Sequence, residues 1–408
     1  MATRKNTGKH GSRPRLKPRR KTDPAFLGFR RPSGGPGARN HLAVLSVMDN
    51  TNPLVRRIGS LRRDLVAVNT TFGRNLMGED ELQHFRVMGH MAGHPNVGAA
   101  IIVSLEPNSA NRLAEAASKA SPWMPIEIVT VHETGGTLKT ADRALEVAGT
   151  LSRHLAAAKR EPCGLGEITL GTECGGSDTT SGLVSNPVTG MVSDRVVELG
   201  GTVIFSETLE IVGAEHLLAS RAADSKTKRR LMECVKRTIA YAEEVGVDLI
   251  GCNPTPDNIK GGLSSIEEKS LGAIKKAGNG PITQVVGVGE RPTKRGTIFA
   301  DAPCGGVENV TSLSASGAQA IIFSTGIGNP IGHPISPTIK VTGNPGTAAH
   351  MPENIDLDLS GVLENSISYE EAADLLEKEL LEVLSGKRTT SELLGETEIT
   401  VSRTGLNL

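Results

Sequence analysis

The chain has 408 residues and a formal net charge of zero, and hydrophobic residues make up 38% of it but aromatic residues only 2%. This length allows two or three domains with a core of aliphatic side chains, which is typical of α/β proteins with buried parallel strands. No apolar run approaches the ~18 residues of a membrane span, no signal peptide pattern is present, and five scattered cysteines argue against a disulfide scaffold. We therefore expect a cytoplasmic protein with no membrane partner.

The segment 1–24 is strongly basic and holds almost no apolar residues. Such a segment cannot bury enough surface to offset its chain entropy, so it is predicted to be a disordered tail. A basic tail could contact nucleic acid, but no aromatic residues interleave with its charges and the remaining chain is net acidic. A solvated extension is the favoured alternative, and nucleic acid is not expected as a partner.

Three apolar runs follow, at 41–48, 98–105 and 126–131, and each leads into a polar loop. A helical pattern comes after the second, and a long amphipathic pattern over about 138–159 comes after the third. This alternation predicts a parallel sheet covered by helices. We expect a Rossmann-like α/β domain over residues 25–160.

The same alternation resumes afterwards, with expected strands at 167–170, 200–208, 246–253 and 318–325. Capping-box patterns, such as Ser368 followed three residues later by Glu371, mark helix starts. The sequence therefore predicts a C-terminal α/β domain over 161–408, which the candidate residues below make the expected catalytic domain. The whole chain is expected to be α/β, with two domains of mainly parallel sheets flanked by helices.

Strands in the second domain end in loops rich in Gly, Ser, Thr, Asp and Glu, the most unusual being "GTECGGSDTTSG" at 171–182. In open parallel sheets, ligands bind outside the carboxyl ends of the strands, so these loops predict a site at one rim. Cys174 is a candidate thiolate ligand or nucleophile, or else an inert buried thiol. Asp178 either caps a helix or binds a hydroxyl-rich substrate. The segment 325–332 either presents backbone N–H groups to a carboxylate or is a tight turn.

The second candidate group is "SETLEIVGAEH", which contains Glu207, Glu210, Glu215 and His216. Carboxylate and imidazole groups suit a divalent metal or an acid/base pair, and capping or surface roles are the alternative. Two lysines elsewhere in the second domain, Lys260 and Lys340, are candidates to bind a substrate carboxylate, and a solvated role is the alternative. His333 is a candidate to lie at the same rim, and a structural role is its alternative.

These motifs, together with "NPTPDNIKGGLSSIEEKSLGAIKKAG", "TGIGNPIGHPISPTIKVTGNP" and "NIDLDLSG", resemble the signature blocks of the altronate/galactarate dehydratase family over about 27–392. The resemblance implies a hydro-lyase that removes water from a sugar acid or other small hydroxycarboxylate to give a 2-keto-3-deoxy acid. It also implies help from a divalent metal: iron, manganese or magnesium. The sulfolactate sulfo-lyase branch, which releases sulfite, is the alternative.

Many members of that family carry a small SAF-type domain, fused or as a separate subunit. The sequence given has a basic tail in that place, so it resembles the large subunit of two-subunit members and implies a small SAF-type partner. A homo-oligomer is also left open.

On this basis we expect catalytic, substrate-binding and metal-binding groups at the rim of the second domain. The catalytic candidates are Glu207, His216, Lys260 and Asp178. The substrate-binding candidates are Gly175, Gly176, Ser177, Thr325, Gly326, His333 and Lys340, and the metal-ligand candidates are Cys174 and Glu215.

The chain departs from the family pattern in its first domain. The family often has cysteines at positions that align near Asn50, Arg74 and Pro107, and this chain has none there. A soft metal site built on those thiols is therefore not expected. The departure leaves a non-catalytic binding or regulatory subunit of the same fold as a further alternative, which the intact motifs of the second domain oppose.

Overall fold

The computed structural model describes residues 25–404, except for the side chains of residues 250 and 251. The tail predicted over 1–24 lies outside the described residues. The described part of the chain contains no helix that is both long enough and apolar enough to cross a membrane.

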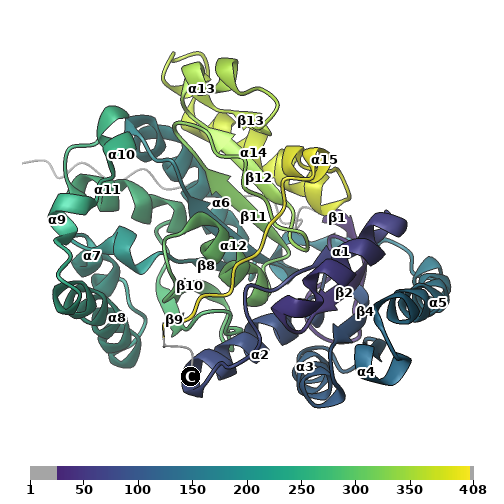
Figure 1. Ribbon diagram of the computed structural model, residues 1–408. Helices are drawn as coiled ribbons and strands as arrows, with labels where there is room; N and C mark the ends of the chain where they lie inside the picture. The colour runs from purple at the N-terminus through teal and green to yellow at the C-terminus, as the bar shows by residue number, and fades with distance from the viewer. Residues whose placement is uncertain (1–24, 405–408) are drawn as a thin grey trace, which may run out of the picture.

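The N-terminal unit is a four-stranded parallel sheet with helices on both faces (Figure 1). Its strand order is β3-β2-β4-β5, and its strands are β2 (His41–Ser46), β3 (Leu65–Val68), β4 (Val97–Ser104) and β5 (Ile126–Thr130). Helices α1 (Asn52–Leu61) and α5 (Thr137–Ala156) pack on one face, and α2 (Gly78–Ala92) and α3 (Pro107–Ala120) pack on the other. β4 is buried along its whole length, as expected for a central parallel strand.

The C-terminal unit is built on a seven-stranded parallel sheet in the order β13-β12-β11-β7-β8-β10-β9. Its strands are β7 (Thr169–Cys174), β8 (Thr202–Phe205), β9 (Ile282–Val286), β10 (Gly296–Ala300), β11 (Ala320–Ser324), β12 (Thr338–Thr342) and β13 (Leu357–Asp358). Both sheets confirm the prediction of parallel α/β architecture. A short antiparallel pair, β1 (Ala25–Gly28) with β6 (Glu161–Gly164), is the exception.

Helices cover both faces of the larger sheet. On one face α6 (Asn186–Glu198) and α14 (Tyr369–Leu384) bury a core with the central strands, while α12 (Gly306–Ala315) packs on the other. Around β8, β9 and β10 a further core forms with α7 (Glu215–Ser220) and α8 (Ser225–Glu244), close to α11 (Ile266–Ala273).

The structure confirms one predicted helix start and contradicts one predicted strand. Ser368 caps α14 in a reciprocal capping box with Glu371, as predicted. The strand expected over 246–253 is wrong, because residues Leu249–Cys252 form the short helix α9. An apolar run of this length fits a strand or a buried helix equally well, and here the short turn after α8 continues into helix.

The C-terminal segment connects the two units. In Figure 1 it runs from α15 (Thr390–Leu394) across the front of α12 towards α2. The Val401 backbone N–H donates to Thr71 Oγ1 at 3.0 Å, and Gln83 donates to the Ser402 carbonyl at 3.0 Å. Ile399 and Val401 are buried in the core of the N-terminal unit. The two units therefore share apolar packing as well as hydrogen bonds.

Candidate active site

The loops that follow β7 and β11 pack directly against each other. The N–H groups of Gly326 and Ile327 donate to the Gly176 carbonyl at 3.0 and 2.9 Å. The close approach of the two loops requires glycine at position 326, because a Cβ there would lie 2.1 Å from the Asp178 carboxylate. β7 lies between β8 and β11 in the sheet, and the strands that follow it in the chain are added first on the β8 side and then on the β11 side. The carboxyl end of β7 is therefore a topological switch point of the sheet.

A cavity of about 310 Å³ opens beside these loops. Residues from the ends of four neighbouring strands and from the α9–α11 region line it, among them Cys174, Ser177, Glu210, Asn253, Lys269 and Cys304. Cys252 also lines it, so three of the five cysteines of the chain meet this cavity. Its size suits a small organic acid.

Glu210 and Lys269 form a buried ion pair at the wall of this cavity. The Lys269 ammonium lies 2.8 Å from Glu210 Oε1, and their side chains are only 7% and 8% exposed. The same ammonium donates to Asn253 Oδ1 at 2.8 Å and to Asn258 Oδ1 at 2.9 Å. Three acceptors therefore fix the position of the charge, which would be costly to bury alone.

A second buried ion pair, Glu207 with Lys276, lies next to Cys174. The Lys276 ammonium donates to Cys174 Sγ at 2.9 Å, and the Cys174 thiol lies 3.6 Å from Glu207 Oε2. Glu207 follows β8 with a left-handed φ of 77°, a conformation that costs an L-residue about 1–2 kcal/mol. Neither Glu207 nor Lys276 lines the cavity, whereas Cys174 does.

Burial dominates the protonation of this second pair. Desolvation raises the pKa of Glu207 above its ordinary value, although the attraction of Lys276 acts in the opposite direction. Burial, reinforced by Glu207, also raises the pKa of the Cys174 thiol far above its usual range. The buried environment therefore favours the protonated thiol form of Cys174.

Glu173 is a third buried carboxyl group beside the pair. It accepts a hydrogen bond from the Asn309 side-chain amide, whose oxygen accepts one from Ser206. Burial, followed by the repulsion of Glu207, raises the pKa of Glu173 well above its usual range.

Each of these three carboxyl groups has one oxygen with no hydrogen-bond partner among the described residues: Glu173 Oε1, Glu207 Oε1 and Glu210 Oε2. Buried polar atoms are nearly always paired, so such atoms in one region indicate a functional constraint. Of the three groups, only Glu210 lines the cavity.

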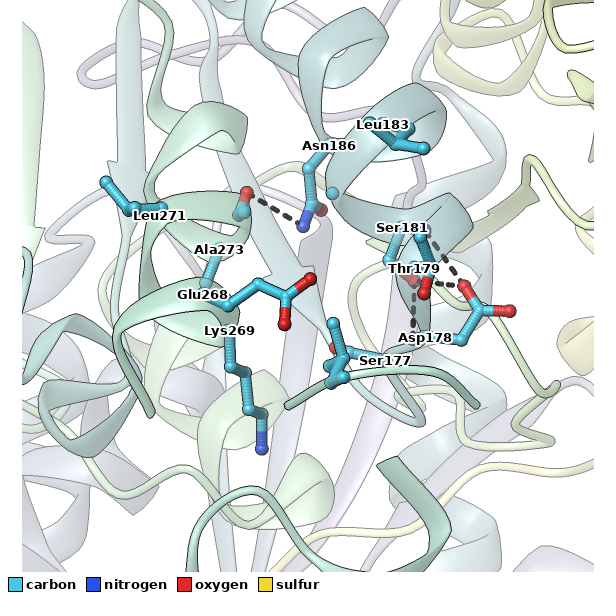
Figure 2. A pocket seen from close by; sticks show the side chains of 13 residues that line it. Ser177, Asp178, Thr179, Ser181, Leu183, Asn186, Glu268, Lys269, Leu271 and Ala273 are labelled. Atoms are coloured by element: carbon cyan, nitrogen blue, oxygen red, sulfur yellow. Dashed lines mark hydrogen bonds between the residues drawn. The ribbon is translucent and has the colours of Figure 1, made fainter. Parts of the chain in front are cut away.

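A smaller cavity of about 220 Å³ adjoins the first and shares Ser177 and Lys269 with it. Figure 2 shows this cavity, with Glu268 and Lys269 from α11 facing the segment that contains Ser177 and Asp178. Asp178 accepts hydrogen bonds from the Ser181 N–H at 2.9 Å and from the Asn344 amide at 2.8 Å. Its carboxylate therefore holds the start of the following helical segment.

Two family models match this chain. The model for the D-galactarate/altronate dehydratase C-terminal domain matches residues 165–407, which is more than half of the chain. The model for the second domain of D-galactarate dehydratase/altronate hydrolase matches residues 28–156. The chain belongs to the D-galactarate/altronate dehydratase family. The resemblance read from its motifs is thereby confirmed.

Curated relatives agree over most of the chain. The (2R)-sulfolactate sulfo-lyase subunit beta of Chromohalobacter salexigens is 37% identical over 93% of this chain and 97% of its own length. Altronate dehydratase of Escherichia coli is 29% identical over 93% of this chain and 78% of its own length. Galactarate dehydratase (L-threo-forming) of Escherichia coli is 33% identical over 75% of this chain and 60% of its own length.

The structure brings some of the predicted site residues of this family member together. Cys174, Gly175, Gly176 and Ser177 line the main cavity. Glu207 lies beside Cys174. Asp178 lines the smaller cavity, and Gly326 packs against it. The Thr325 hydroxyl accepts a hydrogen bond from the Gly328 N–H at 3.1 Å.

Other predicted residues do not line either cavity. His216 and Lys260 are exposed, on α7 and at the end of α10 (Pro256–Lys260), and the Glu215 carboxylate accepts from the Gly213 N–H at 2.6 Å. The buried His333 ring accepts from two backbone N–H groups, and the buried Lys340 ammonium donates to the Pro330 and Ile331 carbonyls. His333 and Lys340 thus hold the shape of the loop after β11, and any direct role of these five residues in catalysis stays a prediction.

The predicted metal ligands do not form a recognisable metal site. Within residues 25–404 no group of three or more His, Cys, Asp or Glu side chains is arranged to hold a metal ion. The unpartnered carboxylate oxygens belong to groups that Lys276, Lys269 and Asn309 already engage. The predicted divalent metal, with Cys174 and Glu215 as its ligands, therefore stays a prediction, and we assign no step to it.

Sequence reasoning missed both buried lysines. Lys269 and Lys276 are seven residues apart, two helical turns, on the stripe that also buries Ile266 and Ala273. The sequence signal for these buried lysines was the presence of lysine at two positions of an otherwise apolar helix face. A lysine is almost never fully buried without a partner, so this pattern could have predicted paired carboxylates.

Proposed function

We propose that this chain is the large subunit of a lyase that eliminates water from a small hydroxycarboxylate bound in the cavity beside Glu210 and Lys269. The observation that carries the proposal is this buried ion pair, because both of its members line the cavity. Membership of the dehydratase family, and relatives named altronate and galactarate dehydratase, support the reaction class.

Elimination next to a carboxylate needs a base for the Cα proton, a positive charge for the enediolate and a proton for the departing hydroxyl. Lys269 supplies the positive charge at the cavity wall, where it attracts the substrate carboxylate and stabilises the charge that develops on it. Glu210 takes the Cα proton and returns it to the hydroxyl that leaves from Cβ. The products are water and an enol that becomes the 2-keto acid.

Glu207 and Lys276 act from behind the cavity in this proposal. Their charges lie beside Cys174, which separates them from the substrate. Glu207 and Lys276 set the electrostatic field beside Cys174 and hold the strand ends in place, so they are positioning residues. Buried carboxyl groups with unpartnered oxygens destabilise a fold, so their presence favours an active site over a subunit that has ceased to catalyse.

A sulfo-lyase is the second candidate. It is supported by the 37% identity to a sulfolactate sulfo-lyase subunit beta across 97% of that protein. Sulfite leaves without first receiving a proton, so the same base and cation would suffice. Because that relative is named as a subunit, we also propose that a small partner subunit completes the active enzyme.

The experiment is a substrate comparison with the full chain, alone and co-expressed with a small SAF-type subunit. Altronate, galactarate and sulfolactate are supplied in turn, and 2-keto acid and sulfite are measured. Keto acid without sulfite supports the dehydratase, and both products from sulfolactate support the second candidate. Lys269→Met should abolish product formation, while the matched surface variant Lys378→Met should not. Absence of both products from the complex with every acid would contradict the proposal.

A further inference from the structure

A cavity larger than the two described above lies in the N-terminal unit and has no role in the function proposed above. Its volume is about 390 Å³, and its lining residues all fall between residues 48 and 132. It shares none of them with the cavities of the C-terminal unit. A ligand here would therefore occupy a separate site.

This cavity lies at the carboxyl ends of the strands, where α/β proteins bind ligands. It is lined by residues that follow the carboxyl ends of all four strands: Met48 after β2, Arg74 after β3, Glu106 after β4 and His132 after β5. The strand order β3-β2-β4-β5 has its switch point between β2 and β4. Ligands bind at this point in open parallel sheets.

Arg74 supplies a positive charge without a partner. It is exposed at the cavity, and no acceptor for its guanidinium lies among the described residues. The loop that carries it is anchored, because Asn52 and Thr70 exchange two hydrogen bonds of 2.8 and 3.0 Å. Gly73 presses this loop against β2 with φ 128°, and a Cβ there would lie 2.4 Å from the Val47 carbonyl.

Arg112 supplies a second positive group, from α3. Its Nη1 lies 2.6 Å from Glu81, and its guanidinium carbon lies 4.1 Å from the centre of the Phe85 ring. These contacts fix the plane of the guanidinium but use only one of its nitrogens. The remaining N–H groups have no acceptor among the described residues, so they are available to a ligand. His132, whose ring also has no such partner, lines the same cavity.

The acidic groups at this cavity are already engaged. The Glu106 carboxylate accepts from the Asn108 and Ser109 N–H groups at 2.6 and 3.0 Å and so caps α3. The hydrogen bond from Ser109, aided by His132, lowers the pKa of Glu106, so the cap is anionic. Glu81 is neutralised by Arg112. These oxygens retain lone pairs that can accept from a hydroxyl group.

We propose that this cavity binds a small hydroxylated organic anion, whose acidic group contacts Arg74 and Arg112 and whose hydroxyl groups donate to Glu81 or Glu106. Two guanidinium groups suit a carboxylate, sulfonate or phosphate oxyacid, and adjacent carboxylates select for hydroxyls. The described lining residues include no cysteine, so the donor set does not suit a soft metal. The proposal is independent of the lyase reaction.

The test is calorimetric titration of the full chain with tartrate, glycerol 3-phosphate and 2-hydroxyethanesulfonate, which carry the three oxyacid groups. Inorganic phosphate and sulfate serve as probes without hydroxyls. We expect saturable binding of at least one hydroxylated anion, tighter than the inorganic ions. Arg74→Gln and Arg112→Gln should each weaken it roughly 10–100-fold, the scale of a charged hydrogen bond. Arg143→Gln, an exposed arginine of the same unit, should leave it unchanged.

A Lys269→Gln variant separates the two sites, because Lys269 lines only the cavities of the C-terminal unit. Binding that survives Lys269→Gln but weakens in the two arginine variants supports the proposal. Absence of saturable binding, binding no tighter than that of the inorganic ions, or binding that Lys269→Gln removes while Arg74→Gln leaves it intact would overturn it. Circular dichroism of each variant shows that the fold is retained, since Arg74 and Arg112 lie at the surface.

Discussion

Lys276 Nζ lies 2.9 Å from Cys174 Sγ while its ammonium also pairs with Glu207, and all three side chains are buried. Burial alone would lower the pKa of Lys276, but Cys174, Glu207 and Glu173 together raise it. The charge of this lysine is therefore required by its surroundings. Removing it leaves carboxyl groups without compensation in a dry environment.

We expect Lys276→Met to destabilise the fold by about 3–5 kcal/mol, the usual cost of removing one partner of a buried pair. Glu207→Gln combined with Lys276→Met should cost less than the sum of the two single changes, because the double variant buries no unpaired charge. Denaturant unfolding of the three variants measures this coupling. Strictly additive losses would show that the two groups do not interact energetically.

Glu207→Gln tests the positioning role that we propose for this catalytic candidate. The change keeps the size of the side chain and removes its charge, so the fold should persist while turnover falls, although by less than in Glu210→Gln, because Glu207 positions the site and does not transfer the proton. Rate and melting temperature are measured on one preparation, with the exposed Glu233→Gln as the control. A folded Glu207→Gln with a normal rate would remove Glu207 from the catalytic machinery.

The raised pKa of Glu207 predicts the pH dependence of the reaction. Below that pKa the carboxyl group is neutral and no longer balances Lys276, so kcat/KM should rise with pH as Glu207 ionises. The midpoint of the acidic limb of the kcat/KM–pH profile should therefore lie above pH 4.5, the ordinary pKa of a glutamate. In Glu207→Gln this limb should move to lower pH. An unchanged limb would show that another group controls it.

The cysteines should differ in their rates of alkylation. Burial raises the pKa of Cys174 beyond its usual range and that of Cys304 to about 12, whereas Cys252 is exposed. Because the thiolate is the reactive form, iodoacetamide should modify Cys252 first and Cys174 last in the native protein. Peptide mass spectrometry over time gives the order. Early modification of Cys174 would contradict the buried thiol described above.

Ile399 tests how the C-terminal segment joins the two units. Its side chain is only 6% exposed and packs in the core of the N-terminal unit, so Ile399→Ala should cost about 2–4 kcal/mol. The nearby Thr404→Ala, at an exposed position, is the matched control. A loss below about 0.5 kcal/mol would show that the segment contributes little to stability.

The sequence was sufficient to predict the parallel α/β architecture, because strands such as β4 and β11 are uniformly apolar and each ends in a polar loop. It also predicted that Cys174 and Glu207 lie at one rim of the second domain. The lysine pattern could have indicated that Lys269 and Lys276 are buried and paired, but not with which carboxylates, because Glu207 and Glu210 lie far away in the sequence. His333 and Lys340 have the residue types of a site, yet they bind backbone groups, and sequence carries no signal for that distinction.

The most direct test of the proposed mechanism is the rate of 2-keto acid formation by Glu210→Gln, measured in the complete complex beside its melting temperature. Among the described residues that line the cavity, Glu210 is the buried carboxylate that has one oxygen without a hydrogen-bond partner. The mechanism predicts a folded variant whose rate falls by roughly 10²–10⁴-fold, the contribution of a positioned base. A folded Glu210→Gln with a rate near that of the unmodified chain would contradict it.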